Sequence, residues 1–332
     1  MKELIKKLCE SFGPAGAERN IRSVIYEELK EFAGDISVDE LGNLVVSHSP
    51  QQAEKHILVA AHMDEIGLMV TFIDDNGFLR FTNIGGVLPK TLVGSKVYFE
   101  NGTVGVIGQE HLKDDKKLDI SKLYIDIGAD NKDTALEKVK IGSTAVFLTS
   151  FCDQGERITA KSVDNRIGCA LLIEAFKQLP SSLPYNVSFA FTVQEEVGLR
   201  GARPLTYRIQ PDFGLAVDVT RANDTPEPEF KTDVSLGKGP AVKVKDSSII
   251  CHSRVVDLMT TVAEENNIPY QMEVLERGGT DAGSIHLSRE GVPTGVVSIP
   301  CRYLHSPSEM VDIDDVEKGV KLLVELLKRE WW

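Results

Sequence analysis

Residues 57–67 have the sequence ILVAAHMDEIG, and this stretch decides how the rest of the chain is interpreted. Its first five residues form a continuous apolar run, which is typical of a strand buried on both faces of a sheet. The run ends at His62, and Asp64 follows two residues later. Because ligands of open α/β sheets bind beyond the carboxyl ends of the strands, these two polar residues lie where a functional site is expected.

The segments on either side of this strand alternate between helix and strand patterns. Helical spacing of apolar residues, with Ser253 as a suitable N-cap for one helix, covers 2–10, 18–32, 166–178, 253–266 and 314–328. Further apolar strands are predicted at 187–193, 213–219 and 296–300, and a hairpin at 36–48. This alternation predicts an α/β fold with a mixed central sheet flanked by helices.

Residues 68–156 interrupt this alternation of helix and strand patterns, because nearly all of their sequence patterns are typical of β-strands. Six short strand patterns follow one another at 68–73, 78–84, 96–100, 103–108, 123–128 and 144–150. Asn76-Gly77 and Asn101-Gly102 are strong signals for tight hairpin turns. We therefore expect one α/β domain made of residues 1–67 and 157–332, split by a small inserted β-barrel domain over residues 68–156.

The composition argues against several classes of function. The 332 residues carry a formal net charge of -13, which argues against nucleic acid and anionic membrane surfaces as partners. No apolar stretch is long enough to span a bilayer, and the N-terminus lacks the apolar run of a signal peptide. The five dispersed cysteines have no CxxC spacing, so we expect reduced thiols and a cytoplasmic location.

Five side chains with metal-binding chemistry lie at or just beyond the ends of separate apolar segments: His62, Asp164, Glu196, Asp218 and His305. Taken singly, each has a structural explanation that is at least competitive, such as a solvated loop residue or a hydrogen-bonded aspartate. Taken together, two imidazoles and three carboxylates suit zinc, cobalt or manganese. The three carboxylates nearly balance two divalent ions, whereas without cations they would repel one another and raise their pKa values. The set predicts a two-metal hydrolase.

Residues next to these candidates have expected supporting roles. Asp64 lies two positions after His62, so in an extended backbone its carboxylate can hold the second ring nitrogen. Glu195 and Glu196 are adjacent and cannot both face one metal, so we assign one to the metal and the other to a water molecule. In the segment GGTDAGS (278–284), Thr280 or Asp281 caps the following helix, or the segment lines a substrate pocket, and both interpretations stay open.

Six segments, in this order, resemble the M42 family of metallo-aminopeptidases: AAHMDEIG (60–67), KSVDNRIG (161–168), QEEVGLRGA (194–202), AVDVT (216–220), GGTDAGS (278–284) and RYLHSPSE (302–309). The resemblance covers nearly the whole chain, including the inserted β domain. It implies the zinc-peptidase-like phosphorylase/hydrolase fold and hydrolysis of peptide bonds. It also implies two divalent ions per subunit, with zinc or cobalt preferred to manganese. Some members of this family carry endoglucanase names.

The family's residue roles carry over to this sequence without a departure at any ligand position. The resemblance implies five metal ligands, which are His62, Asp164, Glu196, Asp218 and His305. Asp164 would bridge both ions, and its peptide bond to Asn165 would be cis. Asp64 would orient His62, and Glu195 would be the general base.

The sequence leaves the substrate pocket and the assembly less defined. Arg221, Gly279 and Thr280 are candidates for substrate binding, and either an arginine that selects acidic residues or an apolar pocket that selects leucine fits. The resemblance implies that the β insertion forms dimers and that the dimers build a tetrahedral dodecamer enclosing the active sites. The preferred N-terminal residue, the physiological metal and the biological substrate stay open.

The leading hypothesis is a dinuclear aminopeptidase that removes N-terminal residues from peptides. In this hypothesis a metal-bridging water is the nucleophile, and Glu195 takes its proton and passes it to the leaving amine. A related N-acyl deacylase or carboxypeptidase would use the same metals. An endoglucanase would instead need two carboxyl groups flanking a sugar bond and no metal. A non-enzymatic assembly module would have no use for the spare carboxylate of Glu195.

Overall fold

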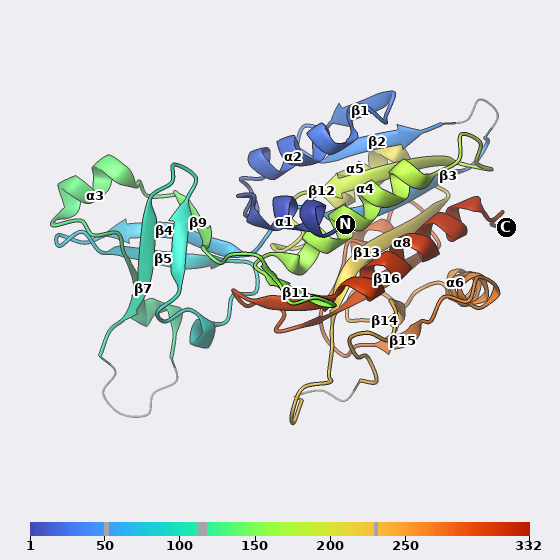
Figure 1. Ribbon diagram of the computed structural model, residues 1–332. Coiled ribbons are helices and arrows are strands. Elements are labelled where there is room, and N and C mark those ends of the chain that lie inside the picture. Colours follow the sequence, from blue (N-terminus) through green and yellow to red (C-terminus); the bar gives the residue numbers. More distant parts are fainter. Residues whose placement is uncertain (50–52, 112–117, 229–231) are drawn as a thin grey trace.

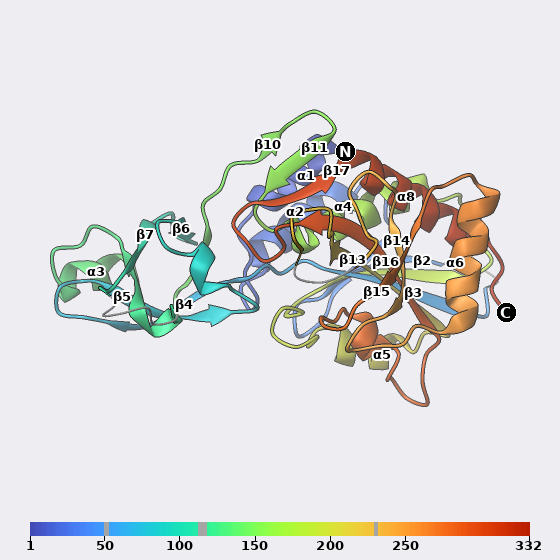
Figure 2. The same ribbon diagram turned by 90° about the horizontal axis from the view of Figure 1, so that it is seen from below.

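A computed structural model describes residues 1–49, 53–111, 118–228 and 232–332 of the chain. Figure 1 shows an α/β unit, which carries both termini, and a smaller β unit set apart at one end of it. The C-terminus lies at the end of the α/β unit that faces away from the β unit in both views (Figures 1 and 2). The predicted α/β fold with an inserted β-barrel is confirmed.

The α/β unit is built on one mixed sheet of 11 strands. In spatial order its main path is β1 (Asp35–Val38), β2 (Leu44–His48), β12 (Asn186–Thr192), β3 (His56–His62), β13 (Phe213–Arg221), β16 (Thr294–Arg302), β17 (Glu309–Asp312), β11 (Arg157–Ala160) and β10 (Cys152–Asp153). Off this path, β14 (Ala241–Lys245) pairs with β16 and with β15 (Gln271–Val274). The central strands β12, β3, β13 and β16 run parallel, so their carboxyl ends meet at one edge of the sheet.

Helices cover both faces of this sheet, as Figure 2 shows. The larger core contains buried residues of α1 (Lys2–Glu10), α2 (Arg19–Leu29), α4 (Val163–Gln178), α6 (Ser253–Glu265) and α8 (Ile313–Lys328). A separate core contains residues of α5 (Ala202–Ile209) and α7 (Ala282–Ile285). Within β3, Ile57 and Val59 belong to the first core and Leu58 and Ala60 to the second, which explains the unbroken apolar run. None of the helices described is long and apolar enough to cross a bilayer.

Two predictions about the helices need correction. The helix expected to reach residue 32 ends at Leu29, and residues 30–32 form a turn in which the Phe32 amide donates to the Leu29 carbonyl with i to i−3 spacing. The predicted N-cap role of Ser253 is wrong, because α6 begins at Ser253 itself. His252 occupies the N-cap position and makes no side-chain cap.

The inserted unit is a closed antiparallel barrel around its own apolar core. Its strands are β4 (Gly67–Ile73), β5 (Leu79–Ile84), β6 (Lys96–Phe99), β7 (Val104–Gln109), β8 (Leu123–Asp126) and β9 (Thr144–Phe147), and they close in the order β4-β5-β8-β7-β6-β9. The short helices η1 (Pro89–Thr91), η2 (Ile120–Lys122) and α3 (Lys132–Lys138) lie between these strands in the chain. All six predicted strands are present. Strand β10 also falls within residues 68–156, but it pairs with β11 in the large sheet.

Candidate metal centre

Strands β3 and β13 bring His62 and Asp218 to the same edge and the same face of the sheet. His62 is the last residue of β3. The parallel register places Ala216 of β13 beside Ala60 of β3, so Asp218 extends the row in which His62 lies. Both side chains are almost completely buried, with 2% of His62 and 5% of Asp218 exposed. Burial of an aspartate at this level requires a cation or strong hydrogen bonds.

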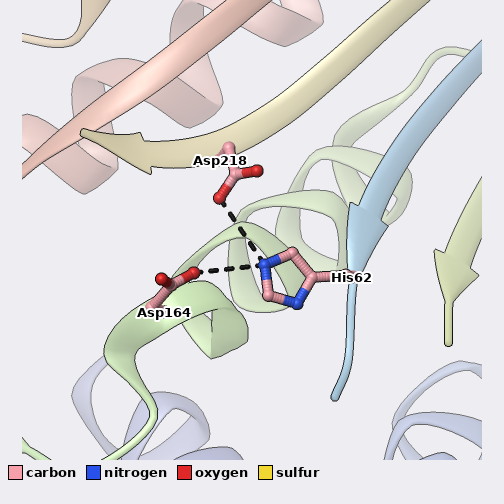
Figure 3. Close-up of side chains that lie close together, drawn as sticks. All are labelled: His62, Asp164 and Asp218. Carbon is pink, nitrogen blue, oxygen red and sulfur yellow. Dashed lines mark hydrogen bonds and ion pairs between the residues drawn. The ribbon is translucent and has the colours of Figure 1, made fainter. Parts of the chain in front are cut away.

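The beginning of α4 brings Asp164 to the same place. The backbone is not helical at Asp164 and Asn165, and the peptide bond between them is cis, as predicted. The side-chain amide of Asn165 donates to the Val217 carbonyl over 2.8 Å, which ties this loop to β13. As Figure 3 shows, Asp164 and Asp218 approach the same ring nitrogen of His62 from two different elements.

The carboxylate of Asp164 lies between two histidines. Its Oδ1 is 3.1 Å from His62 Nε2, and its Oδ2 is 3.1 Å from His305 Nε2. Asp218 Oδ1 lies 3.7 Å from His62 Nε2, and Glu196 Oε2 lies 3.6 Å from His305 Nε2. The donor atoms therefore form two groups within 4.8 Å, His62–Asp164–Asp218 and Asp164–Glu196–His305. All five candidate ligands come together, and Asp164 belongs to both groups.

Asp64 contacts more residues of this site than the sequence predicts. His62 Nδ1 lies 3.2 Å from the Asp64 carbonyl oxygen and 3.6 Å from its carboxylate, which agrees with a role in orienting the ring. The same carboxylate accepts hydrogen bonds from the backbone amides of Glu195 and Glu196, at 3.0 and 3.1 Å. Glu195 Oε2 reaches to 3.8 Å from His62 Nε2 but belongs to neither ligand group. Of the two adjacent glutamates, only Glu196 therefore belongs to a candidate ligand group among the described residues.

Glu309 is a supporting residue that sequence reasoning missed. Its Oε1 accepts a hydrogen bond from the His305 amide over 2.7 Å, and its Oε2 accepts one from the Asp164 amide over 3.0 Å. One buried carboxylate therefore holds the backbone of two ligand candidates that are 141 positions apart in the chain (305 minus 164). The only signal in the sequence is its place four residues after His305.

Replacing Glu309 by Gln is expected to weaken metal binding about tenfold or more, as loss of a residue that supports ligands does elsewhere. A glutamine offers one carbonyl oxygen, so one of the two backbone amides would face an NH₂ group and lose its acceptor. Calorimetric titration of the metal-free variant measures this. An affinity equal to that of the wild type would show that Glu309 does not position the ligands.

The pKa shifts in the site indicate that its carboxylates carry more negative charge than the neighbouring cationic groups of the protein neutralise. Burial raises the pKa of Glu196 to about 8, with the Asp164 charge adding to the rise and His305 opposing it. Burial likewise raises the pKa of Asp218, and that of Glu195 well above its usual range. Burial would also raise the pKa of Asp164, but hydrogen bonds from His305 and His62 outweigh it and lower this pKa.

The donor set fits divalent cations. Burial alone would lower the pKa of His305, but the carboxylates of Glu196 and Asp164 raise it to about 10. Glu196 Oε1 is buried and has no hydrogen-bond partner within the described residues. Nitrogen and carboxylate donors with an unused buried oxygen are the chemistry that zinc, cobalt or manganese would satisfy.

The segment 278–284 lies against the same strands but does not enter either ligand group. Asp281 is buried and accepts a hydrogen bond from the Thr192 hydroxyl, and its side chain does not cap α7. Burial raises the pKa of Asp281 to about 7. Thr280, one position before Asp281 at the N-cap, accepts a hydrogen bond at Oγ1 from the Ala282 amide over 3.3 Å. Gly279 is exposed beside Ser248. Of the three substrate-binding candidates, only Arg221 lines a cavity of about 540 Å³ whose wall includes Leu304 and Ser306.

Residues 42–322 match the family model described as M42 glutamyl aminopeptidase. A relative from Acetivibrio thermocellus, named "Putative aminopeptidase", is 49% identical over 328 residues, which cover 98% of each chain. The lysyl aminopeptidase of Pyrococcus furiosus is 39% identical over 340 residues, covering 98% of this chain and 96% of that one. A solved structure of the TET1 peptidase of Pyrococcus horikoshii superposes with a TM-score of 0.90 at 40% identity, over 99% of each chain. That peptidase is described as assembling into a tetrahedron or a large octahedral shell.

Proposed function

The chain belongs to the M42 glutamyl aminopeptidase family, whose members are hydrolases of peptide bonds, and on this premise we propose that it is a two-metal aminopeptidase releasing N-terminal residues from peptides. The observation that carries the proposal is the carboxylate of Asp164, whose two oxygens each lie 3.1 Å from a different histidine. A carboxylate shared in this way suits a pair of ions rather than one ion.

Two ligand groups would hold the ions. His62, Asp164 and Asp218 would bind one, and Asp164, Glu196 and His305 would bind the other. Zinc and cobalt suit this set of nitrogen and oxygen donors, and manganese is a further candidate. When bound, the ions would act as Lewis acids on a water molecule and on the scissile carbonyl of the peptide.

We assign the proton transfer to Glu195. Its carboxylate lies beside the ligands but outside both groups, and the contact between its backbone amide and Asp64 holds it in place. From there the carboxylate would take the proton of the attacking water and pass it to the amine that leaves. The side chain is only 11% exposed, so bulk water competes little for that proton. The acidic surroundings would also attract the free ammonium group of a peptide and so favour its N-terminal residue.

Three classes of substrate distinguish this proposal from its near rivals. The metal-loaded protein is expected to cleave aminoacyl anilides that have a free amine and to leave their N-acetylated counterparts intact. Release of the acetyl group would instead indicate an N-acyl deacylase. Removal of C-terminal residues from N-blocked peptides would indicate a carboxypeptidase.

Removal of metal is expected to abolish hydrolysis, and two equivalents of zinc, cobalt or manganese per chain are expected to restore it. The reason is that the two ligand groups share Asp164. A divalent ion in each group is therefore needed to balance the negative charge of the buried carboxylates. Titration of the chelated protein with each metal, followed by activity and by bound-metal analysis, measures the stoichiometry. Full activity at one equivalent, or activity that survives complete chelation, would contradict a two-metal mechanism.

We also propose that the chain assembles through its barrel into dimers, and that the dimers form a tetrahedral dodecamer. The support is the structural similarity to a peptidase that forms such shells. Light scattering coupled to size-exclusion chromatography is expected to give about twelve times the chain mass of 36.5 kDa. A monomeric mass under all metal conditions would contradict this. The five cysteines are free in the structure, which supports the proposed cytoplasmic location.

A further inference from the structure

Three ionic side chains meet in the interior of the protein, and the proposed hydrolysis uses none of them. Glu65, Lys161 and Arg166 are 1%, 2% and 0% exposed. The two oxygens of Glu65 lie 2.9 and 2.7 Å from Lys161 Nζ, and Arg166 Nη2 lies 3.3 Å from Glu65 Oε1. Buried charges need such partners, because their removal from water is costly. We call these three residues the ionic trio.

The ionic trio joins two segments of the chain that build the candidate metal centre. Glu65 directly follows Asp64, which contacts the His62 ring. The other two members of the trio flank Asp164, three positions before it and two positions after it. The contacts of the Glu65 carboxylate therefore set the distance between the segment of His62 and the segment of Asp164.

The N-terminal part of the chain encloses the trio with backbone groups. Arg166 Nη1 donates to the Leu8 and Ser11 carbonyls over 2.6 and 3.1 Å, and Nη2 donates to the Gly13 carbonyl over 3.3 Å. The Gly13 amide in turn donates to Glu65 Oε1 over 3.1 Å. A planar guanidinium held by three carbonyls and one carboxylate has a well-defined position.

The backbone between Lys161 and Asp164 is strained, so it depends on contacts from outside the segment. Ser162 has φ 50° and ψ 27°, a left-handed conformation that residues other than glycine rarely adopt. Its hydroxyl donates to the Cys9 carbonyl over 3.1 Å, and its own carbonyl accepts from the Arg166 amide over 3.2 Å. Such a conformation persists where the surrounding structure fixes it. The place of Asp164 therefore depends on the contacts of Lys161 and Arg166.

We propose that the ionic trio positions the metal ligands by holding the His62 and Asp164 segments at the separation that ion binding requires. None of the three residues belongs to a ligand group found in the described chain, so they act through Asp64 and Asp164. The proposal rests on the metal centre of the proposed function. A buried ion pair often contributes little net stability compared with apolar residues of similar volume. Here the charges supply directed hydrogen bonds between two segments that carry ligands, which apolar side chains cannot supply.

A double-mutant cycle of Glu65→Gln and Lys161→Met tests the proposal, with calorimetric titration of the metal-free proteins with zinc. Each single variant is expected to bind zinc about tenfold more weakly, as after the loss of residues that support metal ligands. Glu65→Gln turns an NH₂ group toward the ammonium, and Lys161→Met removes that ammonium. Because both changes break the same contact, the double variant is expected to bind zinc little more weakly than the weaker-binding single variant.

Tyr185→Phe is the control for a loss of stability without a change at the metal centre. The Tyr185 hydroxyl is buried and donates to the Trp331 carbonyl over 2.9 Å. Tyr185 precedes β12, whose last residue, Thr192, pairs with His62, so Tyr185 lies at the opposite edge of the sheet. Its variant is expected to unfold at a lower temperature and to bind zinc within about twofold of the wild type.

Wild-type zinc affinity in both single variants, with or without a lower unfolding temperature, would overturn the proposal. So would additive losses in the double variant, which would show that the two residues act separately. Lys161→Met leaves Glu65 in contact with Arg166, one charge of each sign, so this variant alone decides the proposal if Glu65→Gln fails to fold. Weaker zinc binding in the variants of a protein that hydrolyses no peptide would uphold the role of the trio and refute the aminopeptidase function.

Discussion

Replacement of Glu195 by Gln is expected to lower kcat by about 10³–10⁴-fold while both metal ions stay bound, a loss at the upper end of what a general base contributes. The amide has nearly the shape of the carboxylate but cannot accept the proton of the attacking water. Glu195 lies outside both ligand groups, so the metal ligands remain complete in the variant. Steady-state kinetics and bound-metal analysis on one preparation measure both effects.

Glu196→Gln is the matched control, because the two glutamates are adjacent and Asp64 accepts a hydrogen bond from each backbone amide. Glu196 belongs to one ligand group, so its variant is expected to lose metal affinity as well as rate. Wild-type kcat in Glu195→Gln would refute its role as the base. Loss of metal from that variant would make Glu195 a ligand instead.

The second large effect is expected from Asp164→Asn, which should weaken metal binding at both sites by more than about 100-fold. This loss exceeds the one caused by changing a residue that only supports a metal ligand. Asp164 is the only residue common to the two groups of donor atoms found in the described chain. The asparagine retains one carbonyl oxygen but places an NH₂ group before one histidine, and it removes the negative charge between them. Calorimetric titration is expected to show two weakened sites and almost no activity.

Asp218→Asn provides the comparison for this experiment. Asp218 contacts only the His62 side, at 3.7 Å from Nε2. Its variant is expected to lose affinity at one site and to keep the other near the wild-type value. If Asp164→Asn also weakened only one site, the two ions would not share that carboxylate. The ligand assignment would then have to change.

The sequence predicts well what depends on local pattern. Apolar runs locate β3 and β13, and the rule on strand ends then places His62 and Asp218 at one edge, as the register confirms. The six strand patterns and their Asn-Gly turns predict the barrel in the same way. Asp164 lies in the non-helical beginning of α4 and His305 in a turn, and no periodicity constrains either position. The strand predicted at 296–300 leads to His305, whereas the inclusion of Asp164 depends on the charge balance and on the order of the six segments.

What the sequence does not predict depends on contacts between distant parts of the chain. The bond from the Asp164 amide to Glu309 joins residues 145 positions apart, and no local pattern distinguishes Glu309 from a surface glutamate. The bonds from Glu195 and Glu196 to Asp64 span 131 and 132 positions. The cavity beside His305 needs the barrel loop at 88–91 to lie against the α/β unit, which only the folded chain establishes.

Anomalous diffraction from crystals grown with zinc or cobalt tests the central claim most directly. Two anomalous peaks are expected, one on each side of the Asp164 carboxylate. One should be bound by His62 and Asp218 and the other by Glu196 and His305. A single peak in crystals of fully active protein, or two peaks that do not share Asp164, would contradict the two-metal site.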